Sequence, residues 1–146
     1  MIVTREDIRV KVVSTINAVL QAEFPDIASR TRWPGFPRID VTENKKPYMN
    51  VAIVYLDAEK AGIGKEAPTR NMGMIQLECC YKEGDREGLL TVNALIDRMQ
   101  KLLGATDDMF PLRTYEARNV SPRNGPQEGW QEEGLVTPFW FDSSKS

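Results

Sequence analysis

The chain has no histidine among its 146 residues. This absence excludes histidine-based catalytic triads, histidine metal ligands and a histidine pH switch. The two cysteines, Cys79 and Cys80, are adjacent, so on a strand their side chains point to opposite faces and a bridge between them is strained. There is also no C-x-x-C pair. We therefore expect no disulfide framework, no metal site and no cofactor.

Long apolar runs and an excess of basic residues are also missing. The longest apolar run is Val51–Leu56, far short of the roughly 20 residues that span a bilayer. The start of the chain, MIVTREDIRVK, lacks the apolar core of a secretion signal. Lysine and arginine number 19 and aspartate and glutamate 21, so no basic excess favours nucleic acid or an acidic membrane. We expect a soluble protein, made in a reducing compartment, with no membrane partner.

What the sequence does contain is enough apolar material for one core, because hydrophobic residues make up 41% of the chain. An amphipathic helix is predicted first. Thr4 and Asp7 form a capping-box pattern, and Pro25 ends the helix after Phe24. Apolar residues recur between these ends at a spacing near 3.6, namely Ile8, Val12, Ile16, Val19 and Phe24. One face of this helix therefore packs on another element.

Strands are predicted in the middle of the chain. The proline-broken segment 25–47 predicts short pieces at Ser29–Trp33 and Arg38–Thr42. Tyr48–Leu56 is apolar on both faces in its second half, as in a strand covered on both sides. Met72–Lys82 alternates, which indicates an antiparallel partner with one exposed face. Between them, the polar segment Asp57–Asn71 is long for a hairpin connection and predicts a protruding loop.

A second helix follows, with Asp85 as its N-cap and Gly104 as the expected left-handed residue after its end. Strands are then predicted at Leu112–Val120 and Gly134–Asp142. Pro138 cannot donate a ladder hydrogen bond, so the last strand is expected at an edge or with a bulge.

This order of elements predicts an α+β fold in a single domain, residues 1–146, with a frayed end at Ser143–Ser146. The expected sheet is mostly antiparallel, with about four to five strands. Two amphipathic helices are expected on one face of this sheet, and a long hairpin loop is expected to protrude from it.

Candidate chemical motifs are incomplete. Gly62–Glu66 resembles part of a phosphate-binding loop, but Glu59 stands where the motif needs glycine and Glu66 where it needs serine or threonine. Asp57 and Glu59 could act as acid and base or hold a divalent ion, but such pairs at strand ends are far more often solvated. The cysteines have no histidine to activate them, and Cys79 is expected in the core. We therefore predict that the protein is not an enzyme.

The pattern as a whole resembles the tail-terminator, or tail-completion, proteins of long-tailed phages and prophages, the family of the minor tail protein U. The matching features run in order along most of the chain. They are the first helix, Trp33-Pro34, Pro47-Tyr48 before an apolar strand, the alternation from Gly73 to Tyr81, the helix with Ala94, Ile96 and Met99, Phe110-Pro111-Leu112, and Trp130, Val136, Pro138 and Phe139 at the close.

The resemblance implies a structural virion protein that forms a ring, typically a hexamer, on the tail tube. Such a ring stops tube polymerisation and offers a surface to the head-tail connector protein, while DNA only passes through. Its place is the neck of the virion tail, after assembly in the host cytoplasm. The ring needs a subunit interface, and the hairpin is the candidate, with Asp57, Glu59, Lys60, Ile63, Lys65, Glu66 and Arg70.

Other functions stay open. A head-closure or tail-tube subunit is the nearest alternative within a phage neck. A small α+β nucleic-acid-binding module belongs to a different class, and Trp33, Trp130 and Trp140 could stack on bases in such a protein. The slightly acidic charge balance argues against this second alternative.

Overall fold

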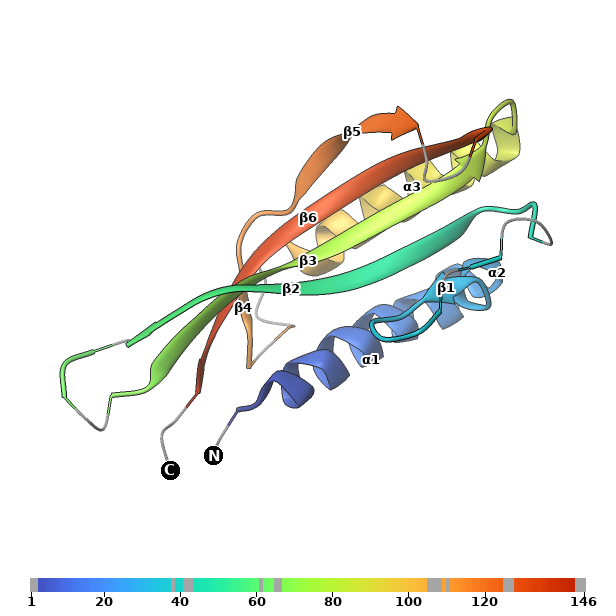
Figure 1. The fold of residues 1–146 in the computed structure, drawn as a ribbon. Coiled ribbons are helices and arrows are strands. Elements are labelled where there is room, and N and C mark those ends of the chain that lie inside the picture. Colours follow the sequence, from blue (N-terminus) through green and yellow to red (C-terminus); the bar gives the residue numbers. More distant parts are fainter. Residues whose placement is uncertain are drawn as a thin grey trace.

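The computed structural model describes residues 3–37, 39–40, 44–60, 62–64, 67–104, 109, 111–124 and 128–143. It has a six-stranded mixed sheet with helices on one face, which confirms the predicted α+β class (Figure 1). The elements in chain order are α1 (Arg5–Glu23), α2 (Pro25–Ala28), β1 (Thr31–Arg32), β2 (Tyr48–Lys60), β3 (Thr69–Lys82), α3 (Arg86–Leu103), β4 (Arg113–Thr114), β5 (Arg118–Asn124) and β6 (Trp130–Ser143).

Helix α1 forms as its sequence predicts. The Thr4 side chain accepts a hydrogen bond from the Asp7 amide, and the Asp7 carboxylate accepts one from the Thr4 amide, so the capping box is complete. The side chains buried along its inner face are Ile8, Val12, Ile16 and Leu20. Pro25 begins the short helix α2, which the periodicity did not predict.

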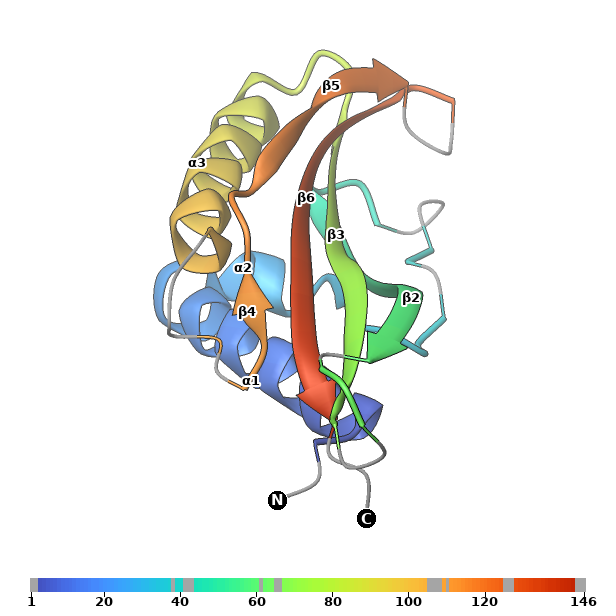
Figure 2. The same ribbon diagram turned by 90° about the vertical axis from the view of Figure 1, so that its left-hand side faces the viewer.

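Helix α3 lies beside α1 on the same face of the sheet (Figure 2). Asp85 is its N-cap, and the Asp85 carboxylate accepts a hydrogen bond from the Gly88 amide at 3.0 Å. Gly104 is the C-cap, but its φ of −81° contradicts the predicted left-handed conformation. Arg98 Nε donates to Glu23 at 2.9 Å and so connects the two helices.

The strands run in the order β1-β2-β3-β6-β4, with β5 also paired to β6. Only β1 is parallel to its neighbour, and the other described pairs are antiparallel. The predicted strand Ser29–Trp33 is present in shorter form as β1, whereas Arg38–Thr42 falls partly outside the described residues. The predicted strand Leu112–Val120 is wrong as a single element, because the chain leaves the sheet between β4 and β5.

The last strand, β6, is interior rather than at an edge, since β3 pairs on one side and β4 and β5 pair on the other. Pro138 is tolerated because it lies between the positions opposite β4 and β5. The Pro138 carbonyl accepts a hydrogen bond from the Tyr115 amide at 2.9 Å, so Pro138 directs its backbone groups away from β3. The N–H that proline lacks would therefore point to the space between β4 and β5, where the ladder does not need it. β6 extends to Ser143, the first residue of the end predicted to fray, and the rest of that end lies outside the described residues.

The core lies between the helices and the sheet. It includes Met49, Leu77, Cys79, Leu95 and Phe139. No helix among the described residues covers the opposite face of the sheet, so the prediction that Tyr48–Leu56 is covered on both sides is wrong for its second half. Val54 is half-buried and Leu56 is exposed.

Candidate interaction surface

The segment predicted as a loop, Asp57–Asn71, is strand at both of its ends. β2 continues to Lys60 and β3 begins at Thr69, with Lys60 opposite Thr69 and a bulge between Tyr55 and Ala58. The end of β6 pairs with the start of β3, from Thr69 opposite Ser143 onward. These paired strand ends project beyond the helices as an arm (Figure 1). We call residues 56–72 together with 140–143 the hairpin arm.

The predicted interface residues differ in position and exposure on the hairpin arm. Asp57, Glu59 and Lys60 are exposed on the distal part of β2. Ile63, in the connection between the strands, is fully exposed, and the Lys60 ammonium donates to the Gly64 carbonyl at 3.2 Å. Lys65 and Glu66 lie outside the described residues. The described part of the arm therefore presents an exposed isoleucine beyond the charged side chains of β2.

Arg70 has a different environment from the one predicted. Its guanidinium binds both carboxylate oxygens of Asp142, at 3.0 and 3.1 Å, and stacks on the Trp140 ring with 4.0 Å to the ring centroid. The ion pair with Asp142 raises the pKa of the Arg70 guanidinium, despite some desolvation. Arg70 therefore joins β3 to β6 in the outer part of the arm, next to the last strand pair.

The arm continues into an apolar part of the open sheet face that the sequence analysis missed. Met72 lies opposite Trp140 and Met74 opposite Pro138, on the face away from the helices. The Tyr115 amide donates a hydrogen bond to the Pro138 carbonyl, which places Tyr115 beside Pro138. The Tyr115 residue is 52% exposed. Residues from three separate segments meet here, so no local pattern in the chain could have identified this surface.

The cysteines lie on the two faces of β3, as predicted, and both are buried. Burial raises the pKa of the Cys79 thiol, which lies in the main core as the sequence analysis expected. Cys80 lies on the other face with Tyr48 and Trp130, whose rings make an edge contact at 5.3 Å. Burial is also the main cause of the raised pKa of Tyr48.

The described residues contain no group of three or more cysteines and carboxylates placed to hold a metal ion. One surface hollow of about 420 Å³ lies between the end of α1 and α3 and is lined by Phe24, Pro25, Leu90 and Ala94 among others. None of the helices in the described part of the chain is long and apolar enough to cross a membrane.

Comparison with known proteins identifies the fold and no family. No protein-family model matches the chain, and no curated protein is similar to it. Thirty chains of solved structures are similar to it. One of them, a protein without a functional name, superimposes with a TM-score of 0.61 over 98% of this chain and 97% of its own length, at 12% sequence identity. That likeness shows that the α+β architecture of the whole chain is shared by an experimentally known protein.

Proposed function

We propose that this chain is a structural virion protein: the subunit of a ring, a hexamer, that caps the tail tube of a long-tailed phage. The ring stops tube polymerisation and carries the surface to which the head-tail connector binds. The proposal starts from the order of sequence features described above. The observation that carries it in the structure is the hairpin arm, which projects from the subunit (Figure 1) and has Ile63 fully exposed.

The arm has the physical properties that a ring contact needs. A closed ring requires a heterologous contact, in which one surface of a subunit meets a different surface of the next. A projecting arm at one end of the molecule can reach a neighbour without displacing the core of its own subunit. An isolated exposed isoleucine gains free energy only when another molecule covers it, whereas Asp57 and Glu59 can stay hydrated at the rim of such a contact.

The charge of the chain is compatible with DNA as passing cargo. The net charge of −2 gives no excess of cations to hold phosphates in a lumen. A tail-tube subunit or a head-closure subunit would share this property, so the experiment must separate the three roles.

Tail tubes assembled in vitro provide that experiment. Tube protein from the phage or prophage that encodes this chain is polymerised with increasing amounts of the chain, and the tubes are imaged by electron microscopy. A terminator shortens the tubes in a dose-dependent way and adds one ring at a single end. A length distribution that does not change, or incorporation of the chain along the whole tube, would reject the proposal.

A further inference from the structure

Strand β2 has a long edge without a partner strand. β1 pairs with Met49 and Asn50 and then ends, while β3 occupies the other side of β2 along most of its length. The register with β1 also pairs the Val51 amide with Arg32, so within the described residues the side of β2 that faces away from β3 is unpaired from Ala52 to Lys60. An edge of this kind presents backbone donors and acceptors in a row.

The hydrogen bonds of β1 show which groups face outward. The Met49 amide donates to the Arg30 carbonyl at 3.3 Å, so the backbone groups of Met49 point away from β3. Because these directions alternate along a strand, the N–H and C=O groups of Ile53 and Tyr55 also point outward. They have no hydrogen-bond partner in the part of the chain that the structure describes. Ala52 and Val54 instead carry the ladder with β3.

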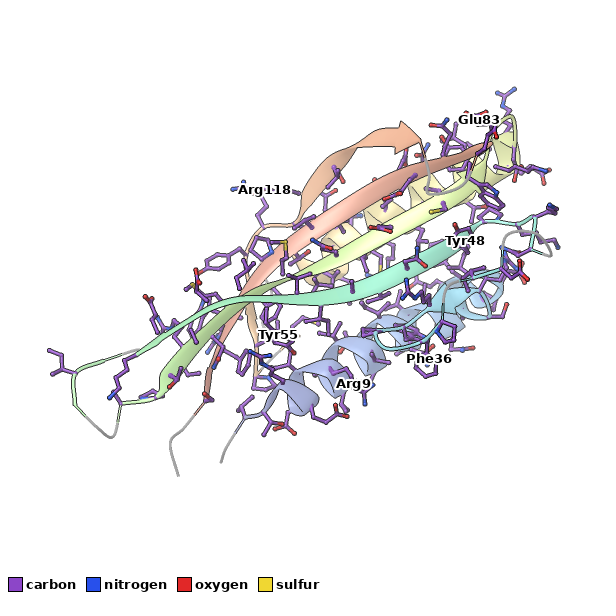
Figure 3. The ribbon with its side chains drawn as sticks, in the orientation of Figure 1. Arg9, Phe36, Tyr48, Tyr55, Glu83 and Arg118 are labelled. Atoms are coloured by element: carbon purple, nitrogen blue, oxygen red, sulfur yellow. The ribbon has the colours of Figure 1, made fainter. Side chains whose placement is uncertain are left out.

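The two edges of the sheet differ in how they are protected. Natural edges carry charges, prolines or bulges that discourage pairing. β5 has all three, with Arg118, Pro122 and a bulge between Val120 and Arg123, and Figure 3 shows Arg118 pointing away from the sheet. β2 has no charged residue and no proline between Val51 and Leu56, and its bulge begins only after Tyr55. This unprotected stretch is typical of an edge that is covered in the functional state.

The edge is also held in one conformation. The Tyr55 hydroxyl donates to the Arg5 carbonyl at 3.3 Å, and the Arg5 guanidinium lies 4.4 Å from the Tyr55 ring centroid (Figure 3). The Tyr55 ring makes an edge contact with Phe139 at 6.1 Å. Anchoring of β2 to α1 and to the core lowers the entropy that an incoming strand has to overcome.

A hollow lies beside this edge at the point where β1 ends. Its volume is about 280 Å³, and its lining includes Trp33, Gly35, Asn50, Ile53 and Gln76. The side-chain oxygen of Asn50 is buried and accepts no hydrogen bond from any described residue. The hollow, whose lining also includes Glu78, could accept a polar side chain of an added strand.

We propose that the β2 edge from Ala52 to Tyr55 binds a short extended segment of a partner protein by strand addition. A second extended backbone can satisfy the outward groups of both Ile53 and Tyr55 at once. β1 limits the segment on one side and the bulge limits it on the other, so about four residues fit, a length of about 13 Å. The segment is free of proline and uncharged, and one polar side chain reaches the Asn50 hollow.

A second copy of β2 does not fit this edge. Antiparallel pairing of two copies with Ile53 opposite Ile53 would place Asp57 of the second copy opposite Met49, a position that Thr31 of β1 already occupies. Registers shifted outward along β2 place Asp57, Glu59 or Lys60 of the second copy opposite the uncharged stretch Ala52–Tyr55. The partner segment therefore belongs to a loop or terminus that can end before β1. The proposal does not depend on ring formation and stands or falls separately from the capping function.

Selection from a library of random displayed seven-residue peptides tests this inference. The wild-type chain is the bait, and the recovered peptides are measured against the wild type, Ile53→Pro and Leu90→Ala. Ile53→Pro removes an outward N–H that the β3 ladder does not use, and we expect the affinity to fall by about tenfold. Leu90 is exposed on α3, so Leu90→Ala serves as the matched control and should bind as the wild type does.

Amide hydrogen exchange on the wild-type chain gives a second readout that no folding defect can disturb. In the free chain, the amides of Ile53 and Tyr55 should exchange faster than those of Ala52 and Val54. A bound peptide should slow the exchange of Ile53 and Tyr55 and leave Ala52 and Val54 unchanged. The inference is overturned if no peptides are recovered, if they bind Ile53→Pro equally well, or if Ile53 and Tyr55 are already protected in the free chain.

Discussion

Arg70 and Asp142 are 72 residues apart in sequence and directly opposite each other on β3 and β6, where the guanidinium binds both carboxylate oxygens and stacks on Trp140. This arrangement joins the hairpin arm to the end of β6. The arm is therefore part of the sheet, and its orientation depends on a contact between distant segments.

Substitution of Arg70 by lysine should loosen the pairing of β3 with β6 in the outer part of the arm. Lysine keeps the charge but loses the bidentate geometry and the planar stacking on Trp140. Because both side chains of the pair are partly exposed, the melting temperature should fall only slightly, while amide exchange should accelerate at Thr69–Met72. Glu6, which pairs with Arg9 on the surface of α1, gives the control Glu6→Gln, and exchange in the arm should not respond to it.

Two leucines on α3 provide a matched pair for the core. Leu95 is fully buried, and Leu95→Ala should lower the free energy of unfolding by about 2–5 kcal/mol. Leu90 is 61% exposed on the same helix, so Leu90→Ala should change the free energy of unfolding by less than about 0.5 kcal/mol. Urea unfolding followed by circular dichroism measures both values. Equal losses for the two variants would contradict the described packing of α3.

Gly73 is required where β2, β3 and β6 come close together. A β-carbon at this position would lie 2.4 Å from the Val54 carbonyl oxygen and 2.8 Å from the Phe139 ring. Gly73→Ala should therefore destabilise the fold by about 1–3 kcal/mol through overpacking. A β-carbon added at Gly62 would make only an ordinary contact, at 3.7 Å. Gly62→Ala therefore serves as the control in denaturant titrations.

The sequence predicts the elements whose ends depend on neighbouring residues. The capping box at Thr4 and the N-cap at Asp85 identify both long helices because their hydrogen bonds join residues only three apart. The arm is different. Its residues are polar and glycine-bearing, and they form strands because the end of β6 pairs with the start of β3. A pattern confined to the segment 57–71 contains no information about Ser143 or Asp142.

The candidate surface also combines features that neighbouring residues determine with features that depend on distant contacts. The exposed positions Asp57, Glu59 and Ile63 could be identified from composition, because nothing in that stretch can form a core. The role of Arg70 could not, since it depends on Asp142 and Trp140. The free edge of β2 was also hidden, because it results from the shortness of β1 and from pairing with β3 on one side alone.

Stability should decrease at alkaline pH because of Cys79. Burial raises the pKa of its thiol above the unfolded value of about 8.5. The unfolded chain therefore loses this proton first, and the contribution to stability is complete below about pH 8.5 and is lost as the pH rises above it. Urea midpoints at pH 7 and pH 9.5 should differ, and Cys79→Ala should reduce the difference. Tyr48 adds a similar effect at higher pH, so the urea midpoint of Cys79→Ala should still depend on pH, but less steeply than that of the wild type.

Shortening the tip of the hairpin separates folding from assembly. Replacement of residues 61–68 by a two-residue Asn-Gly turn removes Ile63 but leaves the strand pairs from Lys60 opposite Thr69 inward. The core lies far from this tip, so the urea midpoint should remain close to that of the full chain. If the arm makes the ring contact, the shortened chain should no longer form rings or limit the length of tail tubes.

The single substitution Ile63→Ser should weaken both activities, because it removes the large apolar side chain while keeping the connection. A shortened chain that still rescues a phage lacking its terminator would show that the contact lies elsewhere on the subunit, with the open sheet face at Met72 and Trp140 as the next surface to test.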